Sequence, residues 1–365
     1  MNPQRIRWMK NLCDIADRVS IYSSSSDILS DSSEPTKILN LSANENLFLE
    51  VATLKRIMFE VLDAYDPRLY RSNYEELRKD LGALNAANPE QILLGNGSDQ
   101  ILDLLVRSVL APKDHAIVIC PTFSMYGILL QCNGTLYTEV PLRSDFSMDV
   151  DSILSSIKPN TRLIFLCSPN NPTGNKQSLE SIERLVRESG CLIVLDEAYL
   201  TINTSSVKLL EKYDNLVILR TFSKSYGIAG LRIGYALSNN TLISILQNRI
   251  QYPFPVSSFS IDVAVRLLEN YSLIQSADTR MRTQRSRTFA DLKSIRGVTP
   301  FPSECNFILF DVEADSREVQ RDLLKYGILV RNIDNVLDFS NCLRVTIAPE
   351  DMMKQFTTAL MEVLS

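Results

Sequence analysis

The order of apolar and helical segments in the middle of the chain is the feature that most constrains the fold. Segments with helical periodicity, such as SLESIERLVRES (178–189), alternate with short apolar runs rich in β-branched residues. The runs are AIVIC (116–120), RLIFLC (162–167), CLIVL (191–195) and LVILR (216–220). Nearly continuous apolar strands that alternate with helices are typical of a parallel sheet covered on both faces. The sequence therefore predicts an α/β fold whose ligands bind beyond the carboxyl ends of the strands.

The rest of the 365-residue chain predicts a second, smaller domain, because a chain of this length rarely forms one core. We expect an N-terminal helix and a Ser-rich connector over residues 1–44, joining the small domain, and a large domain over 45–265. The C-terminal part, 266–365, holds a long Arg-rich helical stretch and two β-like runs, NFILF (306–310) and LRVTI (343–347). This pattern indicates a separate α+β lobe.

Composition excludes several classes of function. A net charge of −5 without a basic run argues against nucleic-acid binding, and no apolar stretch is long enough for a membrane span. The charged N-terminus lacks the apolar core of a secretory signal, and seven scattered cysteines without a CxxC pair fit a reducing cytoplasm. His115 is the only histidine, which argues against a His triad and a multi-His metal site. We expect no metal, and proton transfer by Lys, Tyr or a carboxylate.

Lys224 follows an apolar run in the stretch LRTFSKSYGIAGLRIGY (219–235). Desolvation and a nearby cation would lower the pKa of this lysine, which suits Schiff-base chemistry with a carbonyl compound. The alternative is a surface lysine in a polar loop. The neighbouring Ser223 and the later Arg232 weaken that alternative.

Three further motifs follow expected strands. GNGSDQILDLLVRSVL (95–110) is a Gly-rich turn before an amphipathic helix, which Ser98 would cap and whose N–H groups favour an anion; an ordinary capped helix is the alternative. SPNNPTG (168–174) is a rigid turn that presents amides, or simply a loop. In CLIVLDEAYL (191–200), Asp196 ends an apolar strand, where a carboxylate needs a cationic partner unless it caps a helix.

Together these motifs require an anion, a carbonyl group that reacts with a lysine, and a cationic partner for a buried acid. Pyridoxal 5′-phosphate (PLP) supplies all three through its phosphate, its aldehyde and its pyridine nitrogen. Lys224 would form the Schiff base, and Asp196 would hold the proton of the ring nitrogen. Ser223, Arg232 and Thr221 would bind the phosphate.

From about Leu41 to the C-terminus, the sequence also resembles fold-type I PLP-dependent aminotransferases, and most closely the histidinol-phosphate aminotransferase family. The resemblance rests on an ordered set of motifs: LSANEN, GNGSDQILDLL, PTFSMY, SPNNPTG, DEAY, FSKSYGIAGLRIGY, GILVRN and CLRVTIAPE. It implies a large domain with a mostly parallel sheet flanked by helices, and a smaller α+β domain.

The resemblance also implies roles around the cofactor ring. Lys224 would carry the Schiff base and move a proton between the substrate Cα and C4′ of the cofactor. Asp196 would pair with the pyridinium nitrogen, and Tyr199 and Asn171 would hydrogen-bond the ring oxygen O3′. Phe123, in PTFSMY, occupies the place of the aromatic residue that stacks on the ring.

Further implied residues bind the phosphate or belong to a second subunit. Gly97, Ser98 and Asp99 open the helix that receives the phosphate, together with Arg232. The family is dimeric, and Tyr70 matches a tyrosine that reaches the cofactor of the neighbouring subunit. The sequence therefore predicts a cytoplasmic homodimer.

Substrate recognition is implied for the C-terminal lobe. Arg331 and Arg344 are thirteen residues apart and match two arginines of the family, of which the second binds the carboxylate of glutamate and the phosphate of histidinol phosphate. Asn46 lies in the N-terminal segment that covers the substrate. The implied reaction transfers an amino group from L-histidinol phosphate to 2-oxoglutarate, giving imidazole acetol phosphate and glutamate.

Three departures from the family leave the substrate open. Leu47 and Phe48 follow the N-E-N triplet where the family has a proline, RLYRSN is one residue short, and TIAP replaces T-I-G-T. An aromatic-amino-acid aminotransferase or a threonine-phosphate decarboxylase would share the cofactor motifs. A PLP-binding regulator would need an N-terminal DNA-binding module, for which about 40 residues are too few.

Overall fold

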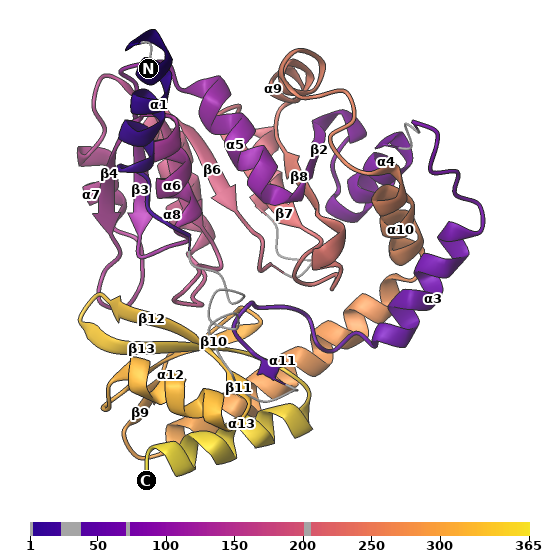
Figure 1. Ribbon diagram of the computed structural model, residues 1–365. Coiled ribbons are helices and arrows are strands. Elements are labelled where there is room, and N and C mark those ends of the chain that lie inside the picture. Colours follow the sequence, from indigo (N-terminus) through magenta and orange to yellow (C-terminus); the bar gives the residue numbers. More distant parts are fainter. Residues whose placement is uncertain (1–2, 23–37, 71–73, 201–205) are drawn as a thin grey trace.

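A mixed seven-stranded sheet forms the centre of the molecule in the computed structural model, which describes residues 3–22, 38–70, 74–200 and 206–365 (Figure 1). The strand order is β2-β8-β7-β6-β5-β3-β4. β8 alone runs opposite to the other six strands of this sheet. The bounds are β2 (Ile92–Asn96), β3 (His115–Cys120), β4 (Leu136–Pro141), β5 (Thr161–Cys167), β6 (Leu192–Asp196), β7 (Leu216–Thr221) and β8 (Ile233–Leu237). The predicted α/β fold is confirmed, with all four expected apolar runs in parallel strands.

Helices cover both faces of this sheet, so its strands are apolar on both sides. In β5, Leu163 and Phe165 pack into one hydrophobic cluster, whereas Ile164 and Leu166 pack into another. Each cluster therefore fills the space between one face and its own helices. These helices are α4 (Tyr74–Asn85), α5 (Gly97–Val109), α6 (Met125–Cys132), α7 (Val150–Ser155), α8 (Leu179–Ser189), α9 (Asn240–Ile245) and α10 (Ser258–Glu269). Short 3₁₀ and π turns lie at Pro89–Gln91, Ser206–Glu211, Ala229–Leu231 and Leu246–Ile250.

Residues 271–365 form a second layer of structure, below the large sheet in Figure 1. An antiparallel sheet of order β12-β13-β10-β9 packs with helices α11, α12 and α13. Its strands are β9 (Val298–Pro300), β10 (Phe307–Val312), β12 (Arg331–Val336) and β13 (Phe339–Thr346); the helices are α11 (Tyr271–Ser294), α12 (Ser316–Lys325) and α13 (Glu350–Val363). The expected α+β lobe is therefore present, while the domain borders drawn from the sequence stay a prediction.

The N-terminal part contacts both layers. Helix α1 (Pro3–Ala16) agrees with the expected N-terminal helix, and the amide of Ser20 donates to Oε1 of Gln131 at the end of α6. Further on, β1 (Leu39–Asn40) pairs in parallel with β11 (Ile328–Leu329) of the C-terminal layer, and α3 (Val51–Leu62) follows. Most of the Ser-rich connector, residues 23–36, lies outside the described residues. None of the described helices is long and apolar enough to cross a membrane.

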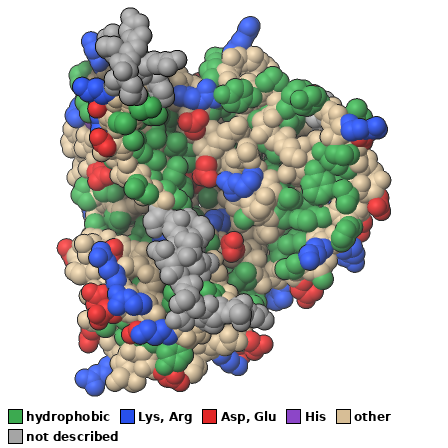
Figure 2. Space-filling model, in the orientation of Figure 1, with side chains coloured by type: hydrophobic (Ala, Val, Ile, Leu, Met, Phe, Trp, Pro, Cys, Tyr) green, Lys and Arg blue, Asp and Glu red, His purple; other side chains and the backbone are tan. Residues whose placement is uncertain are grey.

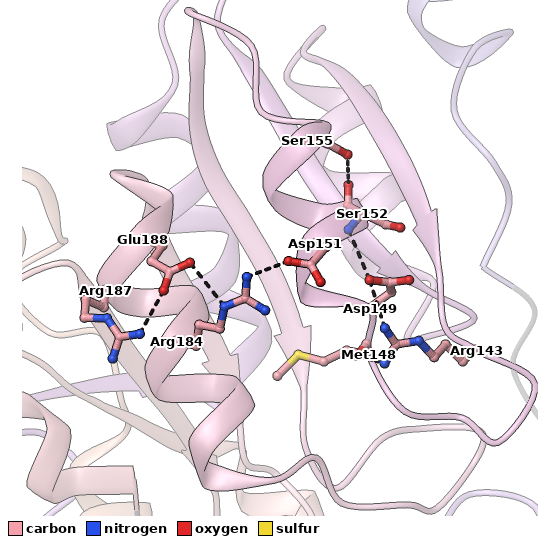
Figure 3. Close-up of polar contacts among 9 residues, drawn as sticks. All are labelled: Arg143, Met148, Asp149, Asp151, Ser152, Ser155, Arg184, Arg187 and Glu188. Atoms are coloured by element: carbon pink, nitrogen blue, oxygen red, sulfur yellow. Dashed lines mark hydrogen bonds and ion pairs between the residues drawn. The ribbon is translucent and has the colours of Figure 1, made fainter.

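Capping and ion pairs fix two short helices on one side of the sheet, as Figure 3 shows. The Asp149 carboxylate accepts a hydrogen bond from the Ser152 amide, which caps α7 and satisfies one of its free N–H groups. Arg184 of α8 then bridges Asp151 of α7 and Glu188 of its own helix. These exposed contacts orient α7 and α8 relative to each other without forming a functional site.

A buried ion pair joins the two strands that carry the central motifs. Arg220 of β7 donates through Nε and Nη2 to Oε2 of Glu197, at 3.1 and 2.7 Å, and the two side chains are only 7% and 3% exposed. Ser206 and Asn85 complete the network, since Ser206 donates to Oε1 of Glu197 and Asn85 accepts from Nη1 of Arg220. Because Glu197 directly follows Asp196, this network fixes the backbone at the end of β6.

Replacing Arg220 with Met should destabilise the protein, because it leaves the Glu197 carboxylate buried without its cation. We expect the free energy of unfolding in urea to fall by about 3–5 kcal/mol. The double variant R220M/E197Q should regain part of this loss, since its buried side chains are neutral. Arg266→Met, which removes an exposed ion pair with Glu269, is the control and should leave the midpoint of urea unfolding unchanged. The same free energy of unfolding for R220M and R266M would contradict the stabilising role assigned to the buried ion pair of Arg220 and Glu197.

Candidate active site

A cavity of about 470 Å³ lies between the two layers, at the carboxyl ends of the parallel strands. Its walls come from strand ends and loops that are far apart in the sequence. Eleven of the residues singled out from the sequence line it: Ser98, Asp99, Phe123, Asn171, Asp196, Tyr199, Ser223, Lys224, Arg232, Arg331 and Arg344. Thr221, expected beside them, lines it as well. The structure therefore brings together motifs that span more than two hundred residues of sequence.

Lys224 lies at the centre of this cavity, three residues beyond β7. Its Nζ donates to the carbonyl oxygen of Ala43 at 2.9 Å and lies 5.6 Å from the centre of the Tyr199 ring. It forms no ion pair with any residue that the structure describes. Burial, together with the positive charge of Arg344, lowers the pKa of Lys224 to about 8. A larger share of its amine is therefore neutral, and nucleophilic, near neutral pH than in an exposed lysine.

Asp196 ends β6 opposite this lysine and is 4% exposed. Its Oδ2 accepts from the Tyr126 hydroxyl at 2.7 Å, and its Oδ1 accepts from the Ala198 amide at 2.9 Å. No cationic side chain of the described residues pairs with it. Burial therefore raises the pKa of Asp196 to about 6, although both hydrogen bonds oppose this shift. A cationic ligand placed against this carboxylate would stabilise its charged form.

The first turn of α5 and the loop after β7 form a cradle at one end of the cavity. Arg232 donates to Oδ2 of Asp99 at 3.0 Å and to the Ser223 hydroxyl at 3.5 Å. Gly97 has φ +76°, and a Cβ there would lie 2.6 Å from Nη2 of Arg232, so only glycine permits this approach. Helix α5 begins at Gly97, with Ser98 inside its first turn; the expectation that Ser98 caps the helix is therefore wrong. Backbone N–H groups, hydroxyls and a guanidinium at one place suit a phosphate.

Arg344 of β13 lies on the opposite side of the cavity and is 8% exposed. Its Nη1 donates to Oδ1 of Asn171, and its Nη2 donates to the Ser42 carbonyl oxygen at 2.7 Å. Its Nε is buried without a hydrogen-bond partner among the described residues, and no described carboxylate pairs with it. Burial lowers the pKa of Arg344, and the positive charge of Arg331, its register partner on β12, adds to this effect. An anion in the cavity would supply the negatively charged partner that this guanidinium lacks.

Tyr199 lines the same cavity as Lys224 and Arg344. Its ring packs edge-on against Phe307 of β10, with centroids 5.1 Å apart, and its hydroxyl accepts from Nδ2 of Asn44 at 3.0 Å. Burial raises the pKa of Tyr199 above its usual range, so the hydroxyl keeps its proton at neutral pH. Tyr199 can therefore donate a hydrogen bond inside the cavity.

Two residues expected in the site lie elsewhere in this chain. Tyr70 is 84% exposed and stacks on Phe254 at 4.6 Å, away from the residues that line the cavity. Asn46 lies beside an adjoining small pocket, where its Nδ2 donates to the Ser225 carbonyl oxygen at 2.8 Å. In this arrangement Asn46 holds the loop that carries Lys224.

Among the residues that sequence reasoning missed, Asn44 and Tyr22 line the cavity, and Tyr126 lies buried behind it against Asp196. Tyr126 lies in the first turn of α6, three residues after Phe123, and the two rings pack edge-on with centroids 5.7 Å apart. Asn44 is one of two asparagines in SANEN, and nothing local distinguishes it from Asn46. Tyr22 reaches the cavity from the N-terminal segment, with its ring 6.4 Å from Phe123. Only the tertiary fold reveals this contact.

The raised pKa of Asp196 predicts a pH-dependent effect of Asp196→Asn on ligand-free protein. Because the folded-state pKa of about 6 exceeds the usual value of 3.8, the buried carboxylate destabilises the fold increasingly as pH rises through this window. We expect Asn at this position to raise the free energy of unfolding by about 1–3 kcal/mol at pH 8, and by less at pH 5. Urea denaturation at both pH values measures this difference. A variant that is less stable than the parent at pH 8 would contradict the account, and Asp103→Asn on the exposed face of α5 is the control.

Comparison with known proteins agrees with this geometry. The family model "Aminotransferase class I and II" matches residues 36–360. A histidinol-phosphate aminotransferase of Flavobacterium psychrophilum is 38% identical over 290 residues, covering 78% of this chain and 83% of that protein. One of Cytophaga hutchinsonii is 32% identical over 334 residues, with 90% and 92% covered.

Solved structures share the fold. The crystal structure of histidinol-phosphate aminotransferase from Sinorhizobium meliloti, in complex with pyridoxal-5′-phosphate, has a TM-score of 0.85 at 24% identity and covers 94% of this chain and 95% of that one. L-threonine-O-3-phosphate decarboxylase from Porphyromonas gingivalis has a TM-score of 0.77 at 22% identity, with 90% and 99% covered. The match to the family model over most of the chain, and the relatives above 30% identity, show that this chain belongs to the class I and II aminotransferase family.

Proposed function

We propose that this aminotransferase holds PLP and transfers the amino group of L-histidinol phosphate to 2-oxoglutarate, giving imidazole acetol phosphate and glutamate in histidine biosynthesis. The curated relatives above 30% identity carry this activity in their names. The single observation in the chain that carries the proposal is the buried guanidinium of Arg344, which lacks an anionic partner among the described residues and faces a lysine of lowered pKa.

The residues present fit PLP at three separate points. The Asp196 carboxylate lacks a cation, which a protonated pyridine nitrogen would supply. The cradle formed by Arg232, Ser223 and the first turn of α5 suits the phosphate, and Gly97 keeps it open. Lys224 offers an amine of lowered pKa. When bound, the cofactor supplies an electron sink for the pair of electrons left on the substrate Cα.

The chain itself supplies positioning and proton transfer. Lys224 Nζ would accept the proton from the substrate Cα and return it on the cofactor side, since its lowered pKa lets it do both near neutral pH. Phe123 packs against Tyr126 and would lie against one face of the ring. Tyr199 and Asn171 would contact the ring oxygen, and Asn171 also accepts from Arg344, which joins the cofactor end to the substrate end.

Two arginines would bind the anionic group of the substrate. Arg331 and Arg344 face each other as register partners of β12 and β13, and both line the cavity. A guanidinium pairs with a phosphate or with a carboxylate through two parallel hydrogen bonds. The same pair therefore serves histidinol phosphate in one half-reaction and 2-oxoglutarate in the other. Asn46 would act indirectly, by holding the backbone at Ser225 next to Lys224.

A phosphate-specific decarboxylase is the second candidate, because the decarboxylase of Porphyromonas gingivalis shares the fold and would need the same cofactor residues. The aromatic-amino-acid aminotransferases remain a third. The three candidates form different products. The histidinol-phosphate aminotransferase gives a keto compound and glutamate, the decarboxylase gives an amine and carbon dioxide, and the aromatic-amino-acid aminotransferase gives an aromatic keto acid. Initial rates with histidinol phosphate, threonine phosphate and phenylalanine, with the product identified in each case, decide among them. The proposal fails if threonine phosphate or phenylalanine is converted faster than histidinol phosphate.

Replacing Arg344 with Gln should weaken substrate binding strongly, because it is the only buried guanidinium that lines the cavity among the described residues. We expect kcat/KM for histidinol phosphate to fall by about 10²–10³-fold, mainly through KM. Arg317→Gln is the matched control, since Arg317 pairs with Asp334 of β12 on the exposed side and should leave kcat/KM unchanged. Equal kcat/KM for R344Q and the parent would overturn the assignment.

The chain would act as a homodimer in the cytoplasm. An exposed apolar surface on α3 and on two nearby loops supports the dimer, and Figure 2 shows hydrophobic side chains gathered on this side of the molecule. Its members are Val51, Phe59, Leu62, Leu69, Tyr70, Tyr252 and Phe254. A second copy on this surface would bring Tyr70 to the neighbouring cofactor. Free cysteines, four of them buried, suit a reducing compartment.

Co-expression of two inactive variants tests the shared site. Tyr70→Ala and Lys224→Ala homodimers should both be weak or inactive. In a mixed dimer, one site combines Lys224 of the first chain with Tyr70 of the second, so both groups are intact there. Random pairing should restore about a quarter of the parent activity. Recovery no greater than the sum of the two homodimers would contradict a role for Tyr70 across the interface.

A further inference from the structure

Asn44 belongs to the segment between β1 and α3, which runs between the two layers (Figure 1), and it lines the cavity. It is almost fully buried and has φ +56°, a left-handed conformation that asparagine tolerates better than most residues. Its position between the two layers places its side chain against Tyr199 rather than against solvent. Asn44 is therefore a polar side chain with a fixed place at the centre of the site.

Two residues of the C-terminal layer hold Asn44 from behind. Its amide N–H donates to Oγ1 of Thr346 at 3.0 Å, and its carbonyl oxygen accepts from Nδ2 of Asn306 at 2.9 Å. The Thr346 hydroxyl also lies 3.5 Å from Oδ1 of Asn44, to which it donates. This contact gives the amide oxygen a donor and leaves Nδ2 directed at Tyr199.

The contact with Tyr199 determines where the hydroxyl proton of the tyrosine points. Nδ2 of Asn44 donates to the Tyr199 oxygen at 3.0 Å, and no other described residue hydrogen-bonds this oxygen. A phenol has one proton and accepts through its lone pairs, so a hydroxyl that accepts from Asn44 directs its own proton elsewhere. Phe307 fixes the ring from the side. The remaining direction for the proton is the cavity.

We propose that Asn44 is a positioning residue that orients the Tyr199 hydroxyl as a hydrogen-bond donor to the ring oxygen of the cofactor. The inference rests on the proposed function, since it concerns the partner of Tyr199 in the loaded enzyme. It also couples the two ends of the site. Arg344 and Thr346 are two residues apart on β13, so their side chains lie on the same face of the strand. Because Thr346 holds Asn44, an anion bound by Arg344 contacts the same strand that positions Asn44.

The pH midpoint of the visible absorbance of the bound cofactor measures this donation. A donor to the ring oxygen stabilises negative charge there, which favours loss of the nearby proton and lowers the midpoint. Tyr199→Phe should raise the midpoint by about one to two pH units, the usual range for a hydrogen bond to a charged group. Asn44→Gly keeps the positive φ without strain and should raise the midpoint by about half a unit.

A double-mutant cycle separates positioning from a structural effect. If Asn44 acts through Tyr199, then N44G should cause no further shift in the Y199F background. The PLP dissociation constant should follow the same pattern, rising about threefold or more for N44G alone and not at all in Y199F. Asn40→Ala is the control: its side chain holds Ser42 in the same segment without reaching Tyr199, so it should leave the midpoint unchanged.

Each outcome decides the inference. A midpoint for N44G equal to that of the parent overturns it, and so does an N44G shift of the same size in the Y199F background or in N40A. In these cases the proposed function stands, because the cofactor band itself is present. If the parent protein shows no visible band after PLP is supplied, the proposed function and this inference fail together.

Discussion

Three buried or half-buried ionisable groups, Asp196, Lys224 and Arg344, face one cavity without a partner of opposite charge among the described residues. A folded chain rarely tolerates even one such group, because an unpaired charge in a low-dielectric site destabilises the fold. The pKa values of Asp196 and Lys224 shift to about 6 and about 8 in the directions that reduce their charge. These shifts indicate a site built for a ligand with a cationic ring nitrogen, a carbonyl carbon and anionic groups.

The backbone of the segment from Leu41 to Asn44 contacts two of these groups, Lys224 and Arg344. Its four successive carbonyl oxygens accept from the Thr346 amide, Arg344, Lys224 and Asn306, respectively. The two cations thus contact backbone oxygens that belong to one short strap between the layers. A ligand that bonds Nζ of Lys224 or Nη2 of Arg344 competes with these contacts, so cofactor and substrate act on the same piece of chain. Although it has only four residues, this segment therefore contacts both the lysine and the arginine on which ligand binding depends.

The sequence predicts the sheet, and it predicts which residues gather at the carboxyl ends of its strands, because local pattern decides both. Apolar runs followed by polar motifs mark strands whose carboxyl ends carry Asp196 and Lys224, and parallel pairing brings such ends together. Contacts between the layers were not predictable in this way. Asn44 and Asn46 are two residues apart and chemically identical, yet only Asn44 reaches Tyr199, since the left-handed turn at Asn44 decides which side chain points inward. The approach of Tyr22 to Phe123 likewise depends on where the N-terminal segment crosses α6.

The most direct test of the account is to locate the covalent attachment of the cofactor. Reduction of the PLP-loaded protein with borohydride fixes the cofactor to its lysine, and peptide mapping by mass spectrometry then identifies that residue. The account predicts one modified site per chain, at Lys224 in the peptide that contains FSKSYG. Modification at another lysine, or none at all with PLP in excess, would contradict the claim that this cavity is built around the amine of Lys224.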